Sequence, residues 1–226
     1  MKTCITTLCM GNEWESVLKL SKPYFEKYAD KCGVDFQVMP TNGLHPHAFW
    51  FKLDCFKSLP KYDRILFVDC DVLIRPSAPN IFDIVPEGTC ALYDESELGA
   101  ADRKSAYNYY LQEHNKELAS YNLPKISPPY KGVYYNVGVF VVDKKCNFLV
   151  TPIKELMMPW PEQTYFNIMI NQLNIPSKSL PRGFNDIRVY LKKPFGKNTY
   201  FVHYAGMSVE RTIYMMQKDI EGGYIN

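Results

Sequence analysis

Short apolar runs alternate with longer amphipathic segments through the first third of the chain. A β-branched and apolar run over residues 2–9 predicts a strand, and helical spacing over residues 12–32 predicts a helix. A second strand at residues 34–39 and a second helix at residues 45–58 lead into an apolar strand at residues 65–68. This order, with its short connections, indicates an α/β fold with a largely parallel sheet and a crevice at the C-terminal ends of the strands.

Three residues define the bounds and the shape of the first helix. Asn12 follows a turn, and its side chain is suited to cap the helix N-terminus. Gly33 fits the C-terminal stop, where a left-handed backbone conformation is common. Pro23 falls inside the apolar pattern, and we expect it to kink the helix because proline removes a backbone hydrogen bond.

The rest of the chain continues the mixed pattern less regularly. We expect strands at residues 72–74, 89–93, 137–142, 177–180 and 200–203, and helices at residues 104–120, 162–173 and 209–220. Residues 94–131 become charged, Tyr-rich and finally Pro-rich, so we predict a variable insert there, within a single domain spanning residues 1–226. Within this insert, Tyr107, Tyr109 and Tyr110 are expected to pack their helix rather than to form a platform for a ligand.

The central strand ends on two aspartates separated by one residue, Asp69 and Asp71. A second apolar run follows at once, and burying carboxylates without a partner is costly, so this strand end needs a cation. The plain alternative is a strand cap or a turn that carries an aspartate; the apolar runs on both sides favour a metal site. Alternation along an extended strand directs the thiol of Cys70 into the core and away from the ion.

Composition narrows the class of protein. Apolar residues make up 46% of the chain and charged residues 22%, which is typical of a globular protein. The net charge of +2 gives no reason to expect a nucleic acid partner. Neither a G-x-G-x-x-G nor a G-x-x-x-x-G-K-[ST] motif occurs, which disfavours a dinucleotide-binding fold and a P-loop. The aromatic content of 15% suits a sugar-binding protein and a well-filled core equally.

The seven cysteines form no C-x-x-C pair, and most of them lie among apolar residues. They indicate free thiols in a reducing compartment. No apolar run approaches the roughly 18 residues of a membrane span, and Met1 is followed by a polar strand start instead of a signal peptide. We therefore expect a cytoplasmic protein without disulfides or a transmembrane segment.

A long motif joins a lysine to the paired aspartates. Its first part, residues 52–56, is Lys-Leu-Asp-Cys-Phe. Its second part, residues 59–71, is Leu-Pro-Lys-Tyr-Asp-Arg-Ile-Leu-Phe-Val-Asp-Cys-Asp and ends on the paired aspartates. Three segments follow in order, Tyr135-Asn136-Val137-Gly138, Glu162-Gln163 and His203-Tyr204-Ala205-Gly206. Together these segments resemble the GT-A glycosyltransferases that use nucleotide sugars, most of all the glycogenin and bacterial galactosyltransferase group. The resemblance implies a Rossmann-like three-layer α/β/α sandwich and retention of the anomeric configuration.

The resemblance also implies a metal centre and its neighbours. Asp69 and Asp71 would hold a divalent ion against the nucleotide diphosphate, and His203 would be the third ligand. Two carboxylates and one imidazole suit Mn²⁺ or Mg²⁺ and leave positions for phosphate oxygens. Lys52 would reach the donor sugar and phosphate. The plain alternatives are a solvated helix position for Lys52 and an ordinary buried histidine for His203.

Three residues would face the donor sugar. The resemblance places Asn136 against this sugar, and Glu162 and Gln163 beside the reacting carbon. Glu162 is one methylene longer than the aspartate usual at this position. Asn136 could otherwise be a turn residue, and Glu162 could be an acid favoured by the dipole at a helix N-terminus.

The remaining nucleotide contacts implied by the resemblance come from the first strand and turn, the aspartate motif and the C-terminal segment: Thr7, Leu8, Asn12, Trp14, Cys70, Gly206 and Arg211. Arg211 is the cation nearest to Val209, which stands where the family has a basic residue. Asp94 and Asp102 are weaker candidates for donor contact. Asn185 closes a segment, Leu180-Pro181-Arg182-Gly183-Phe184-Asn185, that also resembles the family.

The sequence therefore predicts a metal-dependent glycosyltransferase that moves a sugar from a UDP-sugar to a hydroxyl acceptor, in glycan synthesis. A non-catalytic nucleotide-sugar binder is the alternative. A phosphatase or phosphotransferase using the aspartate pair is a third class, and its Thr and Lys partner motifs are not found. If the enzyme inverts the anomeric configuration, Glu162 is the first candidate for the general base.

Overall fold

The computed structural model describes residues 1–40, 47–98, 103–146 and 160–226. Its central sheet contains, from one edge to the other, β2 (Asp35–Met39), β1 (Thr3–Leu8), β3 (Arg64–Val68), β6 (Tyr135–Asp143), β5 (Cys90–Asp94) and β7 (Ser177–Ser179). Neighbouring strands pair in parallel except at β6, which is antiparallel to both β3 and β5. The predicted largely parallel sheet is therefore confirmed, with β6 reversed at its centre.

A second, smaller sheet joins the middle of the chain to its C-terminal part. It contains β4 (Val72–Ile74), β9 (Phe201–His203) and β8 (Asp186–Ile187), in that order. The chain leaves β3, turns through residues 69–71 and enters β4, where Val72 pairs with His203. This pairing brings a histidine from the end of the chain to the paired aspartates.

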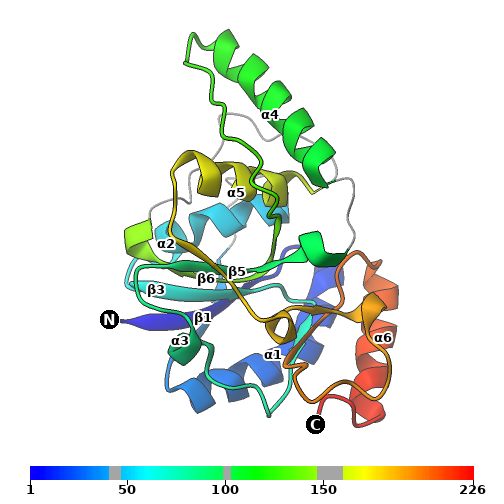
Figure 1. Cartoon of the computed structure of the whole chain (residues 1–226). Helices are drawn as coiled ribbons and strands as arrows, with labels where there is room; N and C mark the ends of the chain where they lie inside the picture. The colour runs from blue at the N-terminus through cyan, green and yellow to red at the C-terminus, as the bar shows by residue number, and fades with distance from the viewer. Residues whose placement is uncertain (41–46, 99–102, 147–159) are drawn as a thin grey trace.

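Helices cover both faces of the central sheet (Figure 1). One face carries α1 (Asn12–Cys32), and α6 (Val209–Glu221) packs beside it. The other face carries α5 (Pro161–Gln172) with the short helices η1 (Ala48–Asp54) and α2 (Cys55–Ser58). The remaining helices are α3 (Ile81–Ile84), α4 (Arg103–Ser120), η2 (Glu95–Leu98), η3 (Lys144–Cys146), η4 (Arg182–Phe184) and η5 (Arg188–Tyr190). The predicted three-layer sandwich is confirmed.

The central strand β3 is buried along its whole length, as its continuous apolar sequence predicts. Its side chains alternate between two apolar cores. Phe67 stacks on Phe140 beneath α5, with ring centroids 5.0 Å apart. Leu66 points to the opposite face, where it joins the core that includes Phe25 of α1. Burial on both sides fixes where the strand ends and therefore where Asp69 emerges.

Two local predictions are corrected. Asn12 does not cap α1: Gly11 occupies the cap position with φ of 93°, and no side chain caps this end of the helix. The second helix begins as the 3-10 helix η1 and becomes α-helical only in α2; residues 45 and 46 lie outside the described residues. Gly33 ends α1 in the left-handed conformation, as expected, and α1 is helical across Pro23.

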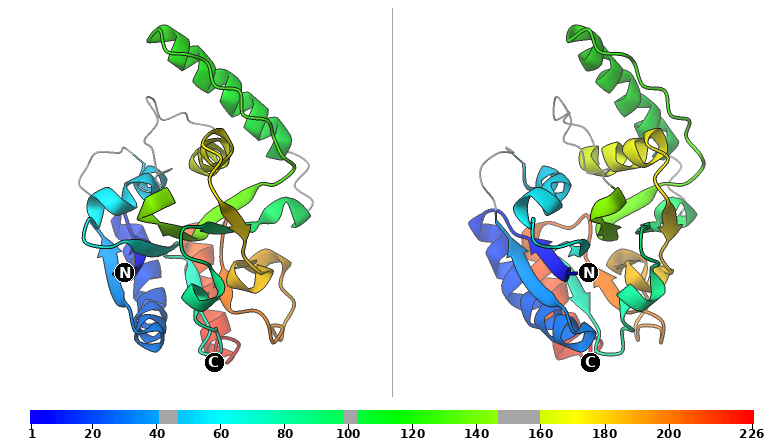
Figure 2. Two further views of the ribbon diagram at one scale, coloured as in Figure 1. Left: turned by 60° about the vertical axis from the view of Figure 1, so that its left-hand side comes forward. Right: turned by 90° about the vertical axis from the view of Figure 1, so that its left-hand side faces the viewer.

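The predicted insert contains a helical arm. Helix α4 projects from the body of the protein, and the chain returns alongside it (Figure 2). Asn115 fastens the return segment through two hydrogen bonds of 2.8 Å to the backbone of Ile126. Tyr107 and Tyr110 are buried, as predicted, whereas Tyr109 is 54% exposed.

The seven cysteines all lie within the described residues, and all are free thiols. The expected absence of disulfides is therefore confirmed. Of the helices in the described ranges, none combines the length and the apolar character that a membrane span requires.

Candidate active site

Asp69, Asp71 and His203 converge at the end of β3. Each offers a ligand atom, and these atoms all lie within 4.8 Å of one another. Nε2 of His203 lies 3.3 Å from Oδ1 of Asp71 and 3.9 Å from Oδ2 of Asp69. The turn after β3 supplies the carboxylates, and the pairing of β9 with β4 supplies the imidazole. The set could hold a divalent cation with oxygen and nitrogen ligands.

Gly138 leaves the space that this cluster needs. A Cβ atom added there would lie 2.2 Å from Cε1 of His203 and 2.9 Å from Oδ2 of Asp69. The backbone carbonyl of Gly138 also accepts a 2.7 Å hydrogen bond from the amide of Asp69. Gly138 therefore lets β6 approach the cluster at a distance that a side chain would prevent, and the three candidate ligands fit a bound ion.

Lys52 is buried, not solvated, so the alternative of a solvated helix position is wrong. Its Nζ atom lies 2.9 Å from both carboxylate oxygens of Asp69 and 3.7 Å from Oε1 of Glu162. Burial acts to lower the pKa of Lys52, but Asp69 and Glu162 outweigh it and raise this pKa above its usual value. The ammonium group is therefore charged at the site.

The candidate ligands differ in their protonation behaviour. Burial raises the pKa of Asp69 to about 6, although Lys52 opposes the shift. Burial also acts to raise the pKa of Asp71, yet His203 outweighs it and lowers that pKa below its usual value. Burial acts to lower the pKa of His203, but Asp71 outweighs it and raises that pKa. Lys52 and His203 thus place positive charge directly beside the two carboxylates.

A cavity of about 400 Å³ opens beside the cluster. Its described lining consists of Leu8, Met10, Trp14, Phe49, Lys52, Asp69, Cys70, Asp71, Glu162, Gly206 and Met207. One part of the lining carries carboxylates and an ammonium group, and the other part is apolar. This arrangement suits a nucleotide, with its phosphates at the charged part and its base at the apolar part. Sequence reasoning proposed all of these polar residues; among the apolar ones it did not single out Met10, Phe49 or Met207.

Three predicted nucleotide contacts are not among the residues described along this cavity. The side chain of Thr7 is fully buried within β1, because alternation turns it away from the cavity that Leu8 reaches. Asn12 and Arg211 are exposed to solvent. Cys70 is buried beside Leu73, as predicted, and still lines the cavity wall.

Glu95 links the residues expected to face the donor sugar, and sequence reasoning missed it. One carboxylate oxygen accepts a 2.8 Å hydrogen bond from the amide of Asn136, and the other accepts a 2.9 Å bond from the amide of Gln163. Arg103 forms an ion pair with the same carboxylate. Glu95 is 4% exposed; Arg103 balances its single negative charge, and each of its two oxygens accepts a hydrogen bond inside the protein.

The network continues from Asn136 to the candidate metal cluster. Oδ1 of Asn136 accepts hydrogen bonds from the amide of Gly138 at 2.8 Å and from Nδ2 of Asn185 at 2.9 Å. Oδ1 of Asn185 lies 2.7 Å from Nδ1 of His203. Asn136 is therefore not a simple turn residue. Asn185, which lies in a segment that resembles the family, orients the imidazole.

Asp94, one of the weaker candidates, does not join this network. Asp94 binds the turn that follows it and the residue before β6: its Oδ1 accepts hydrogen bonds from the amide of Ser96 at 3.0 Å and from the amide of Tyr134 at 3.2 Å. Asp102 lies outside the described residues.

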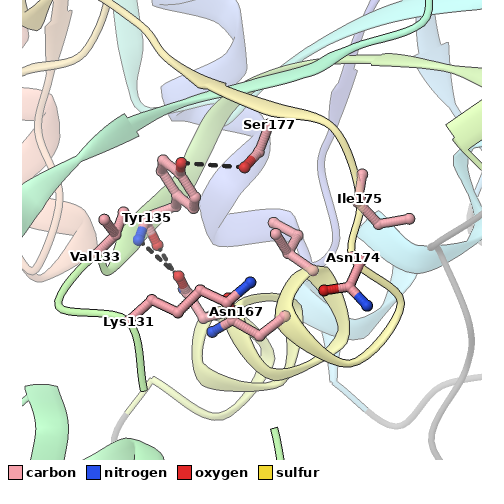
Figure 3. A pocket seen from close by; sticks show the side chains of 9 residues that line it. Lys131, Val133, Tyr135, Asn167, Asn174, Ile175 and Ser177 are labelled. Carbon is pink, nitrogen blue, oxygen red and sulfur yellow. Dashed lines mark hydrogen bonds between the residues drawn. The ribbon is translucent and has the colours of Figure 1, made fainter. Parts of the chain in front are cut away.

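A separate cavity of about 270 Å³ lies between β6, α5 and β7 (Figure 3). Tyr135 faces it, and its hydroxyl group is hydrogen-bonded to Ser177 at 3.3 Å. The backbone of Tyr135 is bonded on the same side to the amide of Asn167. None of the candidate ligands or sugar-facing residues is among the residues described around it, so this cavity is distinct from the candidate site.

Comparison with known proteins assigns the family. The model of glycosyl transferase family 8 matches residues 12–208. Because the match covers most of the chain, the protein belongs to this family and is a glycosyltransferase. Comparison with curated proteins finds no match.

Solved structures share the GT-A fold. One is a glycosyltransferase involved in the glycosylation of the major capsid of PBCV-1, with a TM-score of 0.62 and 13% identity over 96% of this chain and 100% of that chain. Another is the galactosyltransferase LgtC in complex with donor and acceptor sugar analogues, with a TM-score of 0.59 and 14% identity over 95% of each chain. At these identities the likeness establishes the fold alone.

Proposed function

We propose that this protein transfers a sugar from a UDP-sugar to a hydroxyl group of an acceptor, with a divalent cation held by Asp69, Asp71 and His203. The observation that carries the proposal is the convergence of these three side chains within 4.8 Å, beside a cavity that contains a buried lysine. Membership of glycosyl transferase family 8 supports the reaction class. Glycan synthesis in a reducing compartment is the setting that we propose.

Mn²⁺ is the proposed ion, and Mg²⁺ is the alternative. Two carboxylates and an imidazole favour an ion that accepts both oxygen and nitrogen ligands. When bound, such an ion supplies Lewis-acid stabilisation of the departing diphosphate. The hydrogen bond between Nδ1 of His203 and Asn185 leaves Nε2 facing the two aspartates, which suits coordination.

Lys52 would assist the same leaving group. Its charge lies between Asp69 and Glu162, at the wall of the cavity that we assign to the nucleotide. A charged group already fixed by two partners needs little rearrangement when negative charge develops on a nearby phosphate. The aromatic and apolar wall, with Leu8, Trp14 and Phe49, would hold the uracil ring.

The transfer breaks the bond between the anomeric carbon and the diphosphate oxygen, and UDP leaves with the bonding electrons. A new bond forms between the anomeric carbon and the acceptor oxygen, whose proton passes to the released phosphate. We propose retention of configuration, because Glu162 is paired with Lys52 and Glu95 is bound to Asn136 and Gln163. Neither carboxylate is free to act as the general base that inversion requires.

A thermal-shift experiment tests the donor site. UDP should raise the melting temperature when Mn²⁺ is present and much less when a chelator replaces it, because the carboxylates repel an unaccompanied diphosphate. Equal shifts in both conditions would contradict the metal assignment. A protein that binds UDP tightly yet neither hydrolyses nor transfers any UDP-sugar in a broad panel would instead be a nucleotide-sugar binder.

A further inference from the structure

Two cysteines follow neighbouring strands of the central sheet. Cys9 comes directly after β1, and Cys70 lies in the turn after β3. The two strands pair in parallel, with Ile5 opposite Leu66. Continued along both strands, the same register sets Cys9 opposite Cys70. The sheet therefore brings these two thiols together from distant parts of the sequence.

Both thiols also lie on the same face of the sheet. Side chains alternate along a strand, and Ile5 and Leu66 point to the face that α1 covers. Cys9 and Cys70 each lie four residues further along, so alternation directs their side chains to that face too. The burial of Cys70 agrees, because it belongs to an apolar cluster with Val17 of α1.

The two thiols contact each other. Cys9 and Cys70 share a side-chain hydrogen bond. Paired strands lie about 4.8 Å apart, and a disulfide needs Cα atoms roughly 4.4–6.8 Å apart. Both cysteines are free thiols in this structure. Their place in the strand pairing therefore allows a disulfide to form without a rearrangement of the sheet.

Access separates this pair from the other cysteines. Cys9 is half-buried, so a small oxidant can reach it, and its partner lies directly beside it. Cys32 is also half-buried, but its side-chain hydrogen bond is to Tyr28. The remaining cysteines outside the pair are buried: Cys4, Cys55, Cys90 and Cys146. We therefore assign the first reaction with an oxidant to Cys9.

A bond between these thiols would act directly on the candidate metal site. Cys70 stands between Asp69 and Asp71 and lines the nucleotide cavity with them. The residues on both sides of Cys9 line the same cavity. A disulfide holds its sulfur atoms about 2.05 Å apart, much closer than two thiols in contact, so it would draw Cys70 toward β1. Because Asp69 and Asp71 are its direct neighbours, their carboxylates would shift relative to His203.

We propose that Cys9 and Cys70 form a reversible disulfide that switches off metal-dependent nucleotide binding, with a low-molecular-weight disulfide such as oxidised glutathione as the oxidant. The Cys9 thiolate attacks oxidised glutathione and releases one glutathione thiolate, which leaves a mixed disulfide on Cys9. The Cys70 thiolate then attacks the Cys9 sulfur and releases the second glutathione thiolate. The two protein thiols lose two electrons and two protons, and one oxidised glutathione becomes two glutathione thiols.

Disulfides in reducing compartments, the setting proposed for this protein, are usually transient and serve catalysis or redox sensing. The effect on nucleotide binding rests on the proposed function, whereas formation of the disulfide does not. If oxidation weakens the binding of UDP and Mn²⁺, bound UDP and Mn²⁺ must oppose oxidation by the same factor. The disulfide and its effect can therefore be measured separately.

Mass spectrometry tests whether the disulfide forms. The wild-type protein is equilibrated in glutathione buffers of increasing oxidised fraction, alkylated and digested without reduction. We expect a cross-link between Cys9 and Cys70, located by fragmentation, with the other cysteines alkylated as thiols. Saturating UDP and Mn²⁺ should raise the ratio of oxidised to reduced glutathione needed for half cross-linking about tenfold or more. An absent cross-link, glutathione attached to Cys9 alone, or a midpoint that the ligands do not move would overturn the proposal.

Binding of UDP with Mn²⁺, measured as the concentration dependence of the thermal shift, tests the effect of the disulfide. The cross-linked protein should bind UDP about tenfold or more weakly, and dithiothreitol should restore binding. Cys9→Ser should bind UDP as the reduced wild type does and should not respond to oxidised glutathione. Cys32→Ser, at the other half-buried cysteine, is the matched control and should respond as the wild type does.

Two outcomes separate this proposal from the proposed function. A fully cross-linked protein that binds UDP as the reduced protein does would overturn the switch and leave the proposed function standing. If the reduced protein shows no Mn²⁺-dependent binding of UDP, the proposed function falls and the switch falls with it, while mass spectrometry still decides whether the disulfide forms.

Discussion

Gly138 and His203 approach so closely that a Cβ atom on the glycine would lie 2.2 Å from the imidazole Cε1. We predict that Gly138→Ala displaces His203 and abolishes metal-dependent UDP binding, because neither the ring nor β6 has room to move within the buried core. Binding is measured as the UDP-induced thermal shift with Mn²⁺.

Gly196→Ala is the matched control for that experiment. A Cβ atom there would meet only the Thr199 hydroxyl group, at an ordinary distance of 3.8 Å, so UDP binding should match that of the wild type. Normal Mn²⁺-dependent UDP binding by Gly138→Ala would show that the imidazole is not required at the position described.

Asn185 should control metal affinity without touching the metal. Asn185→Ala removes the acceptor for Nδ1 of His203, and we expect about a 10- to 100-fold loss of Mn²⁺ affinity, as is typical when a partner of a ligating histidine is lost. Mn²⁺ titration followed by electron paramagnetic resonance measures this. Asn108→Ala, on the exposed side of α4, should bind as the wild type does. An unchanged affinity in Asn185→Ala would remove His203 from the ligand set.

Lys52→Ala should slow UDP release from a UDP-sugar more than it weakens UDP binding. The reason is that the negative charge on the diphosphate next to Lys52 grows as the bond to the anomeric carbon breaks. The measurement compares the rate of UDP release with the Kd for UDP. Lys104→Ala, at an exposed position on α4, is the control. Equal losses in rate and affinity would mean that Lys52 only holds the nucleotide.

Asp219→Asn should destabilise the fold by about 3–5 kcal/mol at neutral pH, because it leaves the buried Arg188, together with the more exposed Lys193, without their shared partner. Burial acts to raise the pKa of Asp219, but these cations and Tyr204 outweigh it and lower the pKa. A depressed pKa in the folded state gives stability that is present above the unfolded pKa and is lost as pH falls through the folded pKa.

Urea unfolding at several pH values tests that pH dependence. The advantage of the wild type over Asp219→Asn should be constant above the ordinary pKa of an aspartate, about 4, and should shrink below it. A difference between the two proteins that does not change with pH would contradict the charged state assigned to Asp219.

The sequence predicts the central part of the site because the signal is local. The apolar run of β3 and the two acids after it lie within a few residues, so one strand determines both burial and the position of Asp69. His203 lies far along the chain, and no periodicity indicates that β9 pairs with β4 in a second sheet. The family resemblance identified His203 as a candidate ligand, and the pairing of β9 with β4 explains why it lies beside the aspartates.

Glu95 was missed for a physical reason. The same strand-end argument that selected Asp94 applies to its neighbour, and alternation alone cannot choose between them. The register of β5 against β6 shifts between Leu92 and Tyr93, so the side-chain alternation is interrupted just before the strand ends. Glu95 then begins η2, outside the strand, and turns toward Asn136. Tertiary contacts, not the local pattern, determine which acid enters the site.

The most direct test of the central claim is UDP release from UDP-sugars by the purified protein, with and without Mn²⁺, compared with Asp71→Asn. We predict slow release by the wild type that requires the metal. Asp71→Asn should keep its fold by circular dichroism and lose release almost entirely, because one charged ligand of the ion is removed. Release that persists in chelator, or near-normal release by a folded Asp71→Asn protein, would contradict the account.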